Sequence, residues 1–176
     1  MANRQALREL QTRLADRLSI ARKQGVAASW LAVETSSKKY LLPLTQSGEI
    51  FPWVSIQSVP YTQNWFVGVA NLRGGLFGVV DLASFVSGQH PRTKNDLEKS
   101  DSRLVVLNTA LDVNCALMID KLSGLRNQIA FKDFTEKSAD SPAYFGHSYI
   151  DMNNSVWQEI NLQTLAQQAQ FLTIST

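Results

Sequence analysis

The chain has 176 residues, 44% of them hydrophobic, so it can bury roughly two-thirds of its unfolded surface in one large core or two small fused cores. Its single cysteine, Cys115, excludes a disulfide scaffold and fits a reducing cytoplasm. The N-terminus lacks the apolar run of a signal peptide, and no stretch approaches membrane-spanning length, so we expect a soluble, cytoplasmic protein.

The net charge of +2 is unevenly distributed along the chain. Residues 1–25 carry six basic side chains against two acidic ones, a balance of +4, so the remaining 151 residues sum to −2. The basic character belongs to one end, and the rest of the chain offers no footprint for nucleic acid. A small β-barrel that binds nucleic acid is therefore a disfavoured alternative.

Residues 4–23 have the periodicity of an amphipathic helix. One face carries the apolar side chains Leu7, Leu10, Leu14, Leu18 and Ala21. This stripe is narrow and has no aromatic residue, which favours packing on this domain or on a partner over lying on a membrane. We predict that residues 1–25 form an appended helix and that residues 26–176 form the main domain.

From residue 30 the pattern changes to short apolar runs separated by turn-forming residues, which is typical of an all-β domain with small curled barrels. The predicted strands lie at residues 30–33, 40–44, 50–54, 66–70, 76–80, 103–107 and 115–119. A helical turn through Phe85 and an exposed loop at residues 87–102 interrupt this series. Residues 129–147 are interpreted as an irregular connection that precedes a last hairpin. Asn161 then caps a closing helix whose buried face is predicted to hold Leu162, Leu165, Ala169 and Leu172.

The central hairpin, residues 66–80, presents one cation at its tip. Asn71, Gly74 and Gly75 surround Arg73 and tolerate the backbone of a sharp turn. The guanidinium can either bind a carboxylate of a partner or form an intramolecular ion pair that holds its own turn. The residues alone leave these two interpretations open.

The sequence contains few residues or motifs typical of a catalytic site. His90 and His147 are the only histidines, and neither has a second ligand at zinc spacing or a serine nucleophile motif. No phosphate-binding glycine motif is present, and Cys115 lies in an apolar run that predicts an inert buried thiol. We therefore predict no catalytic, cofactor or metal site, while a hydrolase that uses one of the histidines remains a third alternative.

Six blocks of the sequence, in order, resemble the CheW-like domains, the adaptors that couple chemoreceptors to their histidine kinase. The blocks lie at residues 40–44, 49–50, 65–82, 103–107, 120–125 and 157–165. Gly78, Ala116 and Asn161 depart from the family pattern, where proline, glycine and aspartate are usual. The basic N-terminus and residues 61–63 are most similar to the PilI-type branch, which serves type IV pilus (twitching) chemosensory systems. A CheW-like module in another chemosensory pathway is the alternative within the family.

The resemblance implies a mainly β fold of two intertwined five-stranded SH3-like β-barrels, here with an added N-terminal helix and a C-terminal helix. It implies binding of a chemoreceptor cytoplasmic tip and of the regulatory domain of a CheA-like histidine kinase, with membrane association only through the receptor. The residues implied in partner binding are Arg73, Glu49, Ile50, Asn71 and Gly74, together with Asn114, Cys115, Ala116 and Leu117. Glu49 could also be the internal mate of Arg73.

Overall fold

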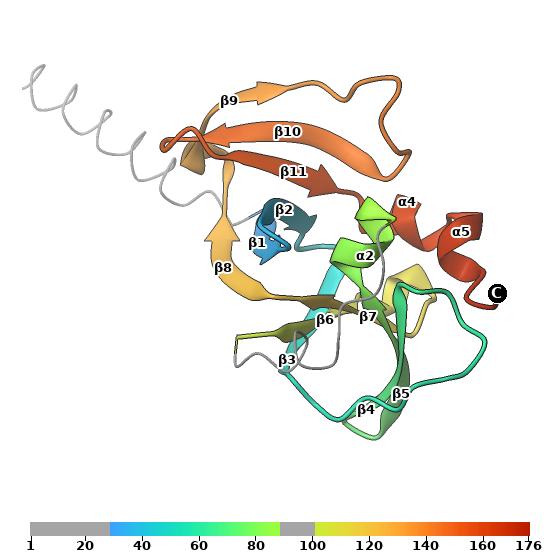
Figure 1. Ribbon diagram of the computed structural model, residues 1–176. Helices are drawn as coiled ribbons and strands as arrows, with labels where there is room; N and C mark the ends of the chain where they lie inside the picture. Colours follow the sequence, from blue (N-terminus) through green and yellow to red (C-terminus); the bar gives the residue numbers. More distant parts are fainter. Residues whose placement is uncertain (1–28, 89–100) are drawn as a thin grey trace, which may run out of the picture.

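The computed structural model describes residues 29–88 and 101–176, which form a mainly β structure with eleven strands (Figure 1). The helix predicted within residues 1–25 and most of the loop predicted at residues 87–102 lie outside the described residues. In the part of the chain that is described, no helix is long and apolar enough to cross a membrane.

The strands form two sheets, one with the order β8-β1-β2-β11-β10-β9 and one with the order β3-β6-β7-β5-β4. The first sheet consists of β1 (Trp30–Thr35), β2 (Lys38–Pro43), β8 (Lys121–Arg126), β9 (Phe131–Thr135), β10 (Phe145–Asp151) and β11 (Val156–Ile160). The second sheet consists of β3 (Ser47–Pro52), β4 (Phe66–Leu72), β5 (Gly75–Asp81), β6 (Arg103–Leu107) and β7 (Cys115–Ile119). Two single-turn 3-10 helices, η1 (Thr109–Leu111) and η2 (Gln128–Ala130), interrupt the connections.

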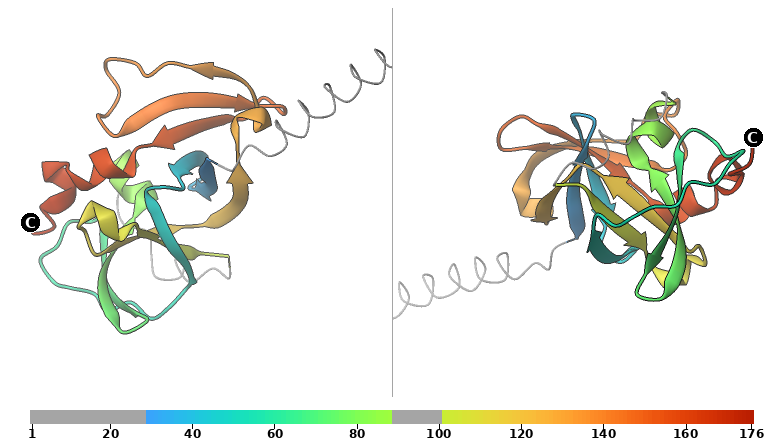
Figure 2. Two further views of the ribbon diagram at one scale, coloured as in Figure 1. Left: turned by 180° about the vertical axis from the view of Figure 1, so that it is seen from behind. Right: turned by 60° about the horizontal axis from the view of Figure 1, so that its bottom comes forward.

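The two sheets are intertwined, because the first takes its strands from both ends of the described chain and the second from the middle (Figure 2). Both sheets are open, and each is mostly antiparallel with one parallel pairing in its interior, β11 with β2 in the first sheet and β5 with β7 in the second. The expected mainly β, intertwined architecture is confirmed. The expected count of five strands per unit holds for the second sheet only, since β9 adds a sixth strand to the first.

The strand β9 and the start of β10 correct the prediction that residues 129–147 are irregular. Lys132 and Asp133 interrupt the apolar residues of β9, so the hydrophobic pattern of the sequence does not predict this strand. The strand exists because it pairs with β10, and because Phe131 packs against the rings of Trp30 and Tyr149. Those partners are distant in sequence, so the pairing is a tertiary effect.

Side-chain alternation along the strands divides the apolar residues among three cores. In β1, Leu31 and Val33 belong to the main core that lies between the sheets, while Trp30 and Ala32 point into a small core of the first sheet. The second sheet has its own inner core around Leu104 and Met118. Strand β1 is thus buried on both faces, as its nearly continuous apolar sequence indicates.

The described residues also form three short helices, α2 (Leu82–Ser87), α4 (Leu162–Ala166) and α5 (Ala169–Leu172). The Asn161 side chain accepts a hydrogen bond from the Thr164 backbone N–H, which confirms the predicted N-cap of α4. The Asp81 carboxylate caps α2 in the same way by accepting a hydrogen bond from the Ala83 backbone N–H. The prediction of a single closing helix was wrong, because α4 ends at Ala166 and a second helix, α5, begins at Ala169.

The break between α4 and α5 changes which side chain reaches the core. Leu172 was expected to be buried but is 54% exposed, whereas Phe171 is 3% exposed and stacks on Trp65. The prediction extended one helical period through residues 167–168, where the helix is in fact interrupted. The buried face of α5 therefore falls at Phe171, one residue before the predicted Leu172.

A close backbone approach at Gly68 ties the segment after β3 to the outer edge of β4. Gln57 and Val69 exchange two backbone hydrogen bonds, each 2.8 Å long. Gly68 has a φ of +145°, and a Cβ there would lie 2.1 Å from the Gln57 carbonyl oxygen. Only glycine fits this position without moving the backbone.

We expect Gly68→Ala to lower the free energy of unfolding by about 2 kcal/mol or more, because it combines a backbone clash with an unfavourable φ. Gly124→Ala is the matched control, since Gly124 also has a positive φ but no atom within 4 Å of the added Cβ. Its loss should be about 1 kcal/mol, from the backbone conformation alone. Urea unfolding measures both, and equal losses would contradict the role of the close approach.

The turn between β10 and β11 is organised by the Asp151 carboxylate. One oxygen accepts hydrogen bonds from the backbone N–H groups of Asn153 and Ser155, and the other accepts one from the Trp157 indole at 2.9 Å. The hydrogen bond from Trp157 is the main cause that lowers the pKa of Asp151 below its ordinary value of 3.8.

Since the folded pKa of Asp151 is depressed, its ionised form stabilises the fold at pH values above the ordinary pKa, and this contribution is lost as the pH falls through the lowered pKa. We expect Asp151→Asn to be less stable than the wild type at neutral pH. The difference should shrink when unfolding is measured at pH values below 3.8. A difference that is constant with pH would contradict the assignment.

Candidate functional site

The candidate site is built on the turn between β4 and β5, which is two residues long. Arg73 and Gly74 both have positive φ, +50° and +82°, as a tight hairpin turn with the twist of its strands requires. The Asn71 side chain accepts a hydrogen bond from the Gly74 backbone N–H at 2.9 Å and braces the turn from within. The stiff turn therefore holds Arg73 outward, with 75% of its side chain exposed.

Strand β3 brings Glu49 to this turn. A guanidinium nitrogen of Arg73 lies 2.6 Å from a Glu49 carboxylate oxygen, and the guanidinium carbon lies 5.9 Å from the centre of the Phe51 ring. Strands β3 and β4 are the two edges of the second sheet, so the ion pair joins opposite edges of one curled sheet. The structure thus confirms an internal mate for Arg73, and that mate is Glu49.

The ion pair leaves the Arg73 side chain accessible. The Glu49 side chain is 43% exposed, and an exposed pair of this kind is screened by water and salt. A partner carboxylate could therefore replace Glu49, or bind beside it, at small energetic cost. The internal and external roles of Arg73 are compatible.

The other predicted site residues are placed differently. Ile50 is half-buried and packs on the main core, while Asn71 and Gly74 are exposed beside Arg73. Asn114 is exposed just before β7, and its carbonyl accepts a hydrogen bond from the Gly78 backbone N–H at 3.0 Å. The structure therefore brings one group of residues together around the turn, and Asn114 begins a second group on another strand.

The remaining members of the second group, Cys115, Ala116 and Leu117, are buried in β7. Burial raises the pKa of the Cys115 thiol to about 12, so the thiol stays protonated at neutral pH. This confirms the predicted inert cysteine. Of this group only Asn114 presents its side chain at the surface.

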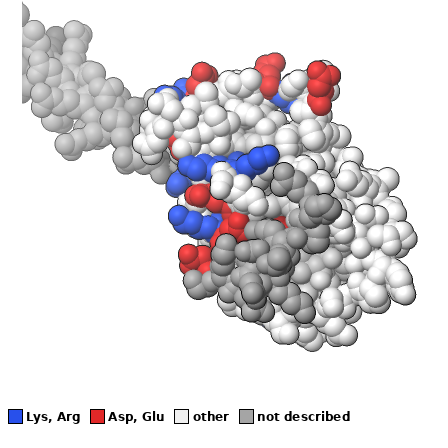
Figure 3. Space-filling view, in the orientation of Figure 1, with Lys and Arg blue, Asp and Glu red and all other residues white. Residues whose placement is uncertain are grey.

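Part of the surface around the second sheet is free of charge, which the search for motifs had overlooked. Residues 50–72 and 160–176 contain no acidic residue, lysine, arginine or histidine. Figure 3 shows the resulting white face on its right and lower sides. This face carries exposed apolar side chains, among them Leu76 near the tip of the Arg73 hairpin and Tyr61. Depletion of charge with exposed aromatic and aliphatic groups is typical of protein interfaces.

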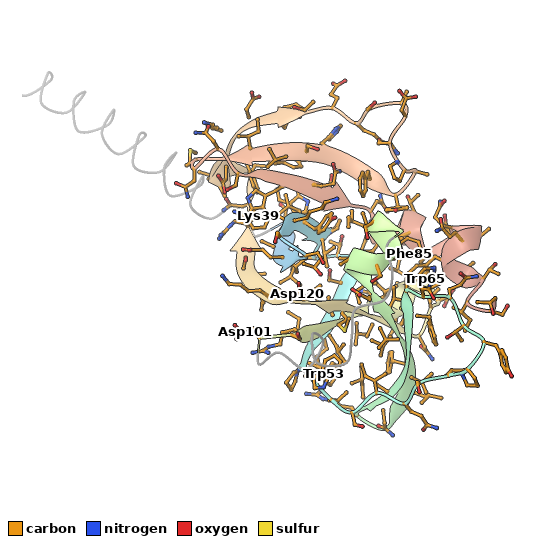
Figure 4. The ribbon with its side chains drawn as sticks, viewed as in Figure 1. Lys39, Trp53, Trp65, Phe85, Asp101 and Asp120 are labelled. Carbon is orange, nitrogen blue, oxygen red and sulfur yellow. The ribbon has the colours of Figure 1, made fainter. Side chains whose placement is uncertain are left out.

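A hollow of about 440 Å³ lies where β2, β11 and the end of α2 meet. Lys39, labelled in Figure 4, lines this hollow. Its ammonium group donates a hydrogen bond to Ser155 and lies 5.2 Å from the centre of the Trp157 ring, so it is already engaged by the fold. Among the described residues, no group of three or more histidine, cysteine and acidic residues could hold a metal ion.

The chain belongs to the family of CheW-like domains, whose family model matches residues 29–170. Protein PilI from Pseudomonas aeruginosa is 27% identical over 107 residues, which are 60% of this chain and 57% of that protein. The match therefore spans little more than half of this relative. The crystal structure of the scaffolding protein TtCheW from Thermoanaerobacter tengcongensis has the same fold, with a TM-score of 0.58 and 20% identity over 76% of this chain and 88% of that chain.

We expect the ion pair to contribute little to stability. In a double-mutant cycle with Arg73→Asn and Glu49→Gln, the coupling free energy should be about 0.2–1 kcal/mol, because both side chains are exposed. Added salt should reduce it further. Asparagine is chosen because it tolerates the positive φ at this position. A salt-independent coupling above about 2 kcal/mol would instead identify the pair as a structural clamp.

Proposed function

We propose that this protein is a non-enzymatic adaptor that couples a methyl-accepting chemoreceptor to a CheA-like histidine kinase, in a pathway that controls type IV pilus twitching motility. Membership of the CheW-like family supports the adaptor role, and the similarity to PilI supports the pilus pathway. The observation that carries the proposal is the exposed Arg73 guanidinium, held at the tip of a stiff turn beside a charge-free apolar face.

Arg73 would bind a carboxylate on the receptor tip. A guanidinium can donate two parallel hydrogen bonds to a carboxylate, a geometry that fixes orientation as well as affinity. Glu49 holds the side chain near this geometry before the partner arrives, which lowers the entropy lost on binding. Ile50, Asn71 and Gly74 would border the contact.

The apolar area of the contact would come from the charge-free face. Its aromatic and aliphatic side chains can exclude water around the charge-assisted hydrogen bonds, which strengthens them. A second contact would lie between the sheets, and Asn114 would be the residue that touches the partner there. The buried residues Cys115, Ala116 and Leu117 would support this contact from the core without touching the partner. Signal transfer requires that the receptor and the kinase each bind two states of the assembly with different affinity.

The test measures binding of the wild type to the cytoplasmic tip of the receptor and to the regulatory domain of the kinase, by isothermal titration calorimetry. Arg73→Asn should weaken binding to the receptor tip by about 10- to 100-fold, the loss expected for a charge-assisted hydrogen bond of about 1–3 kcal/mol. Binding to the kinase domain should be unchanged.

Lys121→Asn is the matched control, because Lys121 is also an exposed cation but lies on β8 of the other sheet. It should bind both partners as the wild type does. A loss equal to that of Arg73→Asn would mean that only general charge matters. If the wild type binds neither partner, the adaptor proposal fails.

A further inference from the structure

A pocket of about 480 Å³ opens between η2 and the β9–β10 pair, on the side of the first sheet that is remote from Arg73. Aromatic side chains dominate its wall, and the Phe134 ring centre lies 5.7 Å from that of His147 and 6.2 Å from that of Tyr149. Phe134 is 56% exposed, and Ile129 beside the pocket is also exposed. Apolar surface of this kind on an edge strand is a site that another segment can cover.

Anionic side chains border the same pocket. Asp133 lines it, and Glu136 and Asp140 follow in the loop after β9; within the described residues none of the three pairs with a cation. Lys132 also lines the pocket, and its ammonium group and that of nearby Lys137 donate hydrogen bonds to the neutral oxygens of Asn154 and Ala143. The three acidic and two basic side chains sum to a net charge of −1. Figure 3 shows acidic side chains along its upper edge, where Figure 1 has β9 and the loop that follows it.

Residues 1–28 join the described chain beside this pocket. The Ser29 backbone N–H donates a hydrogen bond to the Arg126 carbonyl at 2.8 Å, two residues before Gln128 of the pocket wall. The next residue, Trp30, has its ring centre 5.9 Å from that of Phe131 and 4.9 Å from that of Tyr149. The wall of the pocket is therefore in contact with the first described strand.

We propose that residues 4–23 of this chain dock on the β9–β10 pocket, with their leucine stripe against Phe134 and Ile129 and their cations beside the three acidic side chains. The charges are complementary, since residues 1–25 carry +4 and the remainder of the chain −2. The five residues 24–28 can span about 17 Å when extended, so the segment can reach the pocket from Ser29. The stripe buries apolar surface that otherwise faces water.

The test places a nitroxide spin label at Ser19→Cys in the full chain and records nuclear magnetic resonance signals of the folded domain. Ser19 lies on the polar side of the predicted helix, and buried Cys115 will not take up the label. Docking predicts loss of the β9 and η2 signals through paramagnetic relaxation, with the β4–β5 signals retained. The loss of signal must persist when the spin-labelled, isotope-labelled chains are diluted with chains that carry neither label, because this shows that the effect arises within one chain.

Two substitutions of exposed apolar residues locate the contact. Phe134→Ser should restore the β9 signals, whereas Leu76→Ser, at an exposed position on the other sheet, should not. Unaffected β9 signals in the labelled wild type would overturn the proposal. So would an effect that appears only between a labelled chain and a second, isotope-labelled copy, or one that Phe134→Ser leaves unchanged.

Discussion

The core between the two sheets is the constraint on which the rest of the structure depends. Trp65 belongs to this core, where it stacks on Phe171 and makes an edge contact with Phe85. The loop before β4, the helix after β5 and the last helix therefore meet at one ring, and Figure 4 labels Trp65 and Phe85. Because both sheets contribute to this core, neither can form fully without the other. The intertwined path of the chain follows from that shared burial.

The shared core also explains why the candidate site lies where it does. Packing against the first sheet uses one face of β5 and β7, and the inner core of the second sheet uses the other face. The hairpin tip and the edges of the second sheet are left outside these two cores, and these positions carry Arg73 and Glu49. Rigid strands on both sides hold the turn, which suits a side chain that must meet a partner in one orientation.

Charge is divided between the two halves of the molecule in a way that matches two kinds of contact. The second sheet also holds Asp81, which is buried, and Arg103, but residues 50–72, next to the Arg73–Glu49 pair, are uncharged, so one ion pair marks the orientation of an otherwise apolar stretch. The first sheet carries aromatic side chains bordered by acidic ones at β9 and β10. The two surfaces therefore favour occupants of different chemistry and need not compete.

The sequence by itself determined the mainly β class, most strands, the Arg73 turn and the Asn161 helix cap, because each depends on neighbours within a few residues. It did not determine β9, the break between α4 and α5, or the burial of Phe171. These depend on contacts between residues far apart, such as Phe131 with Trp30 and Phe171 with Trp65. Likewise, the sequence suggested Glu49 as one of two possible partners of Arg73, and only the curl of the second sheet, which brings its opposite edges together, placed the two charges 2.6 Å apart.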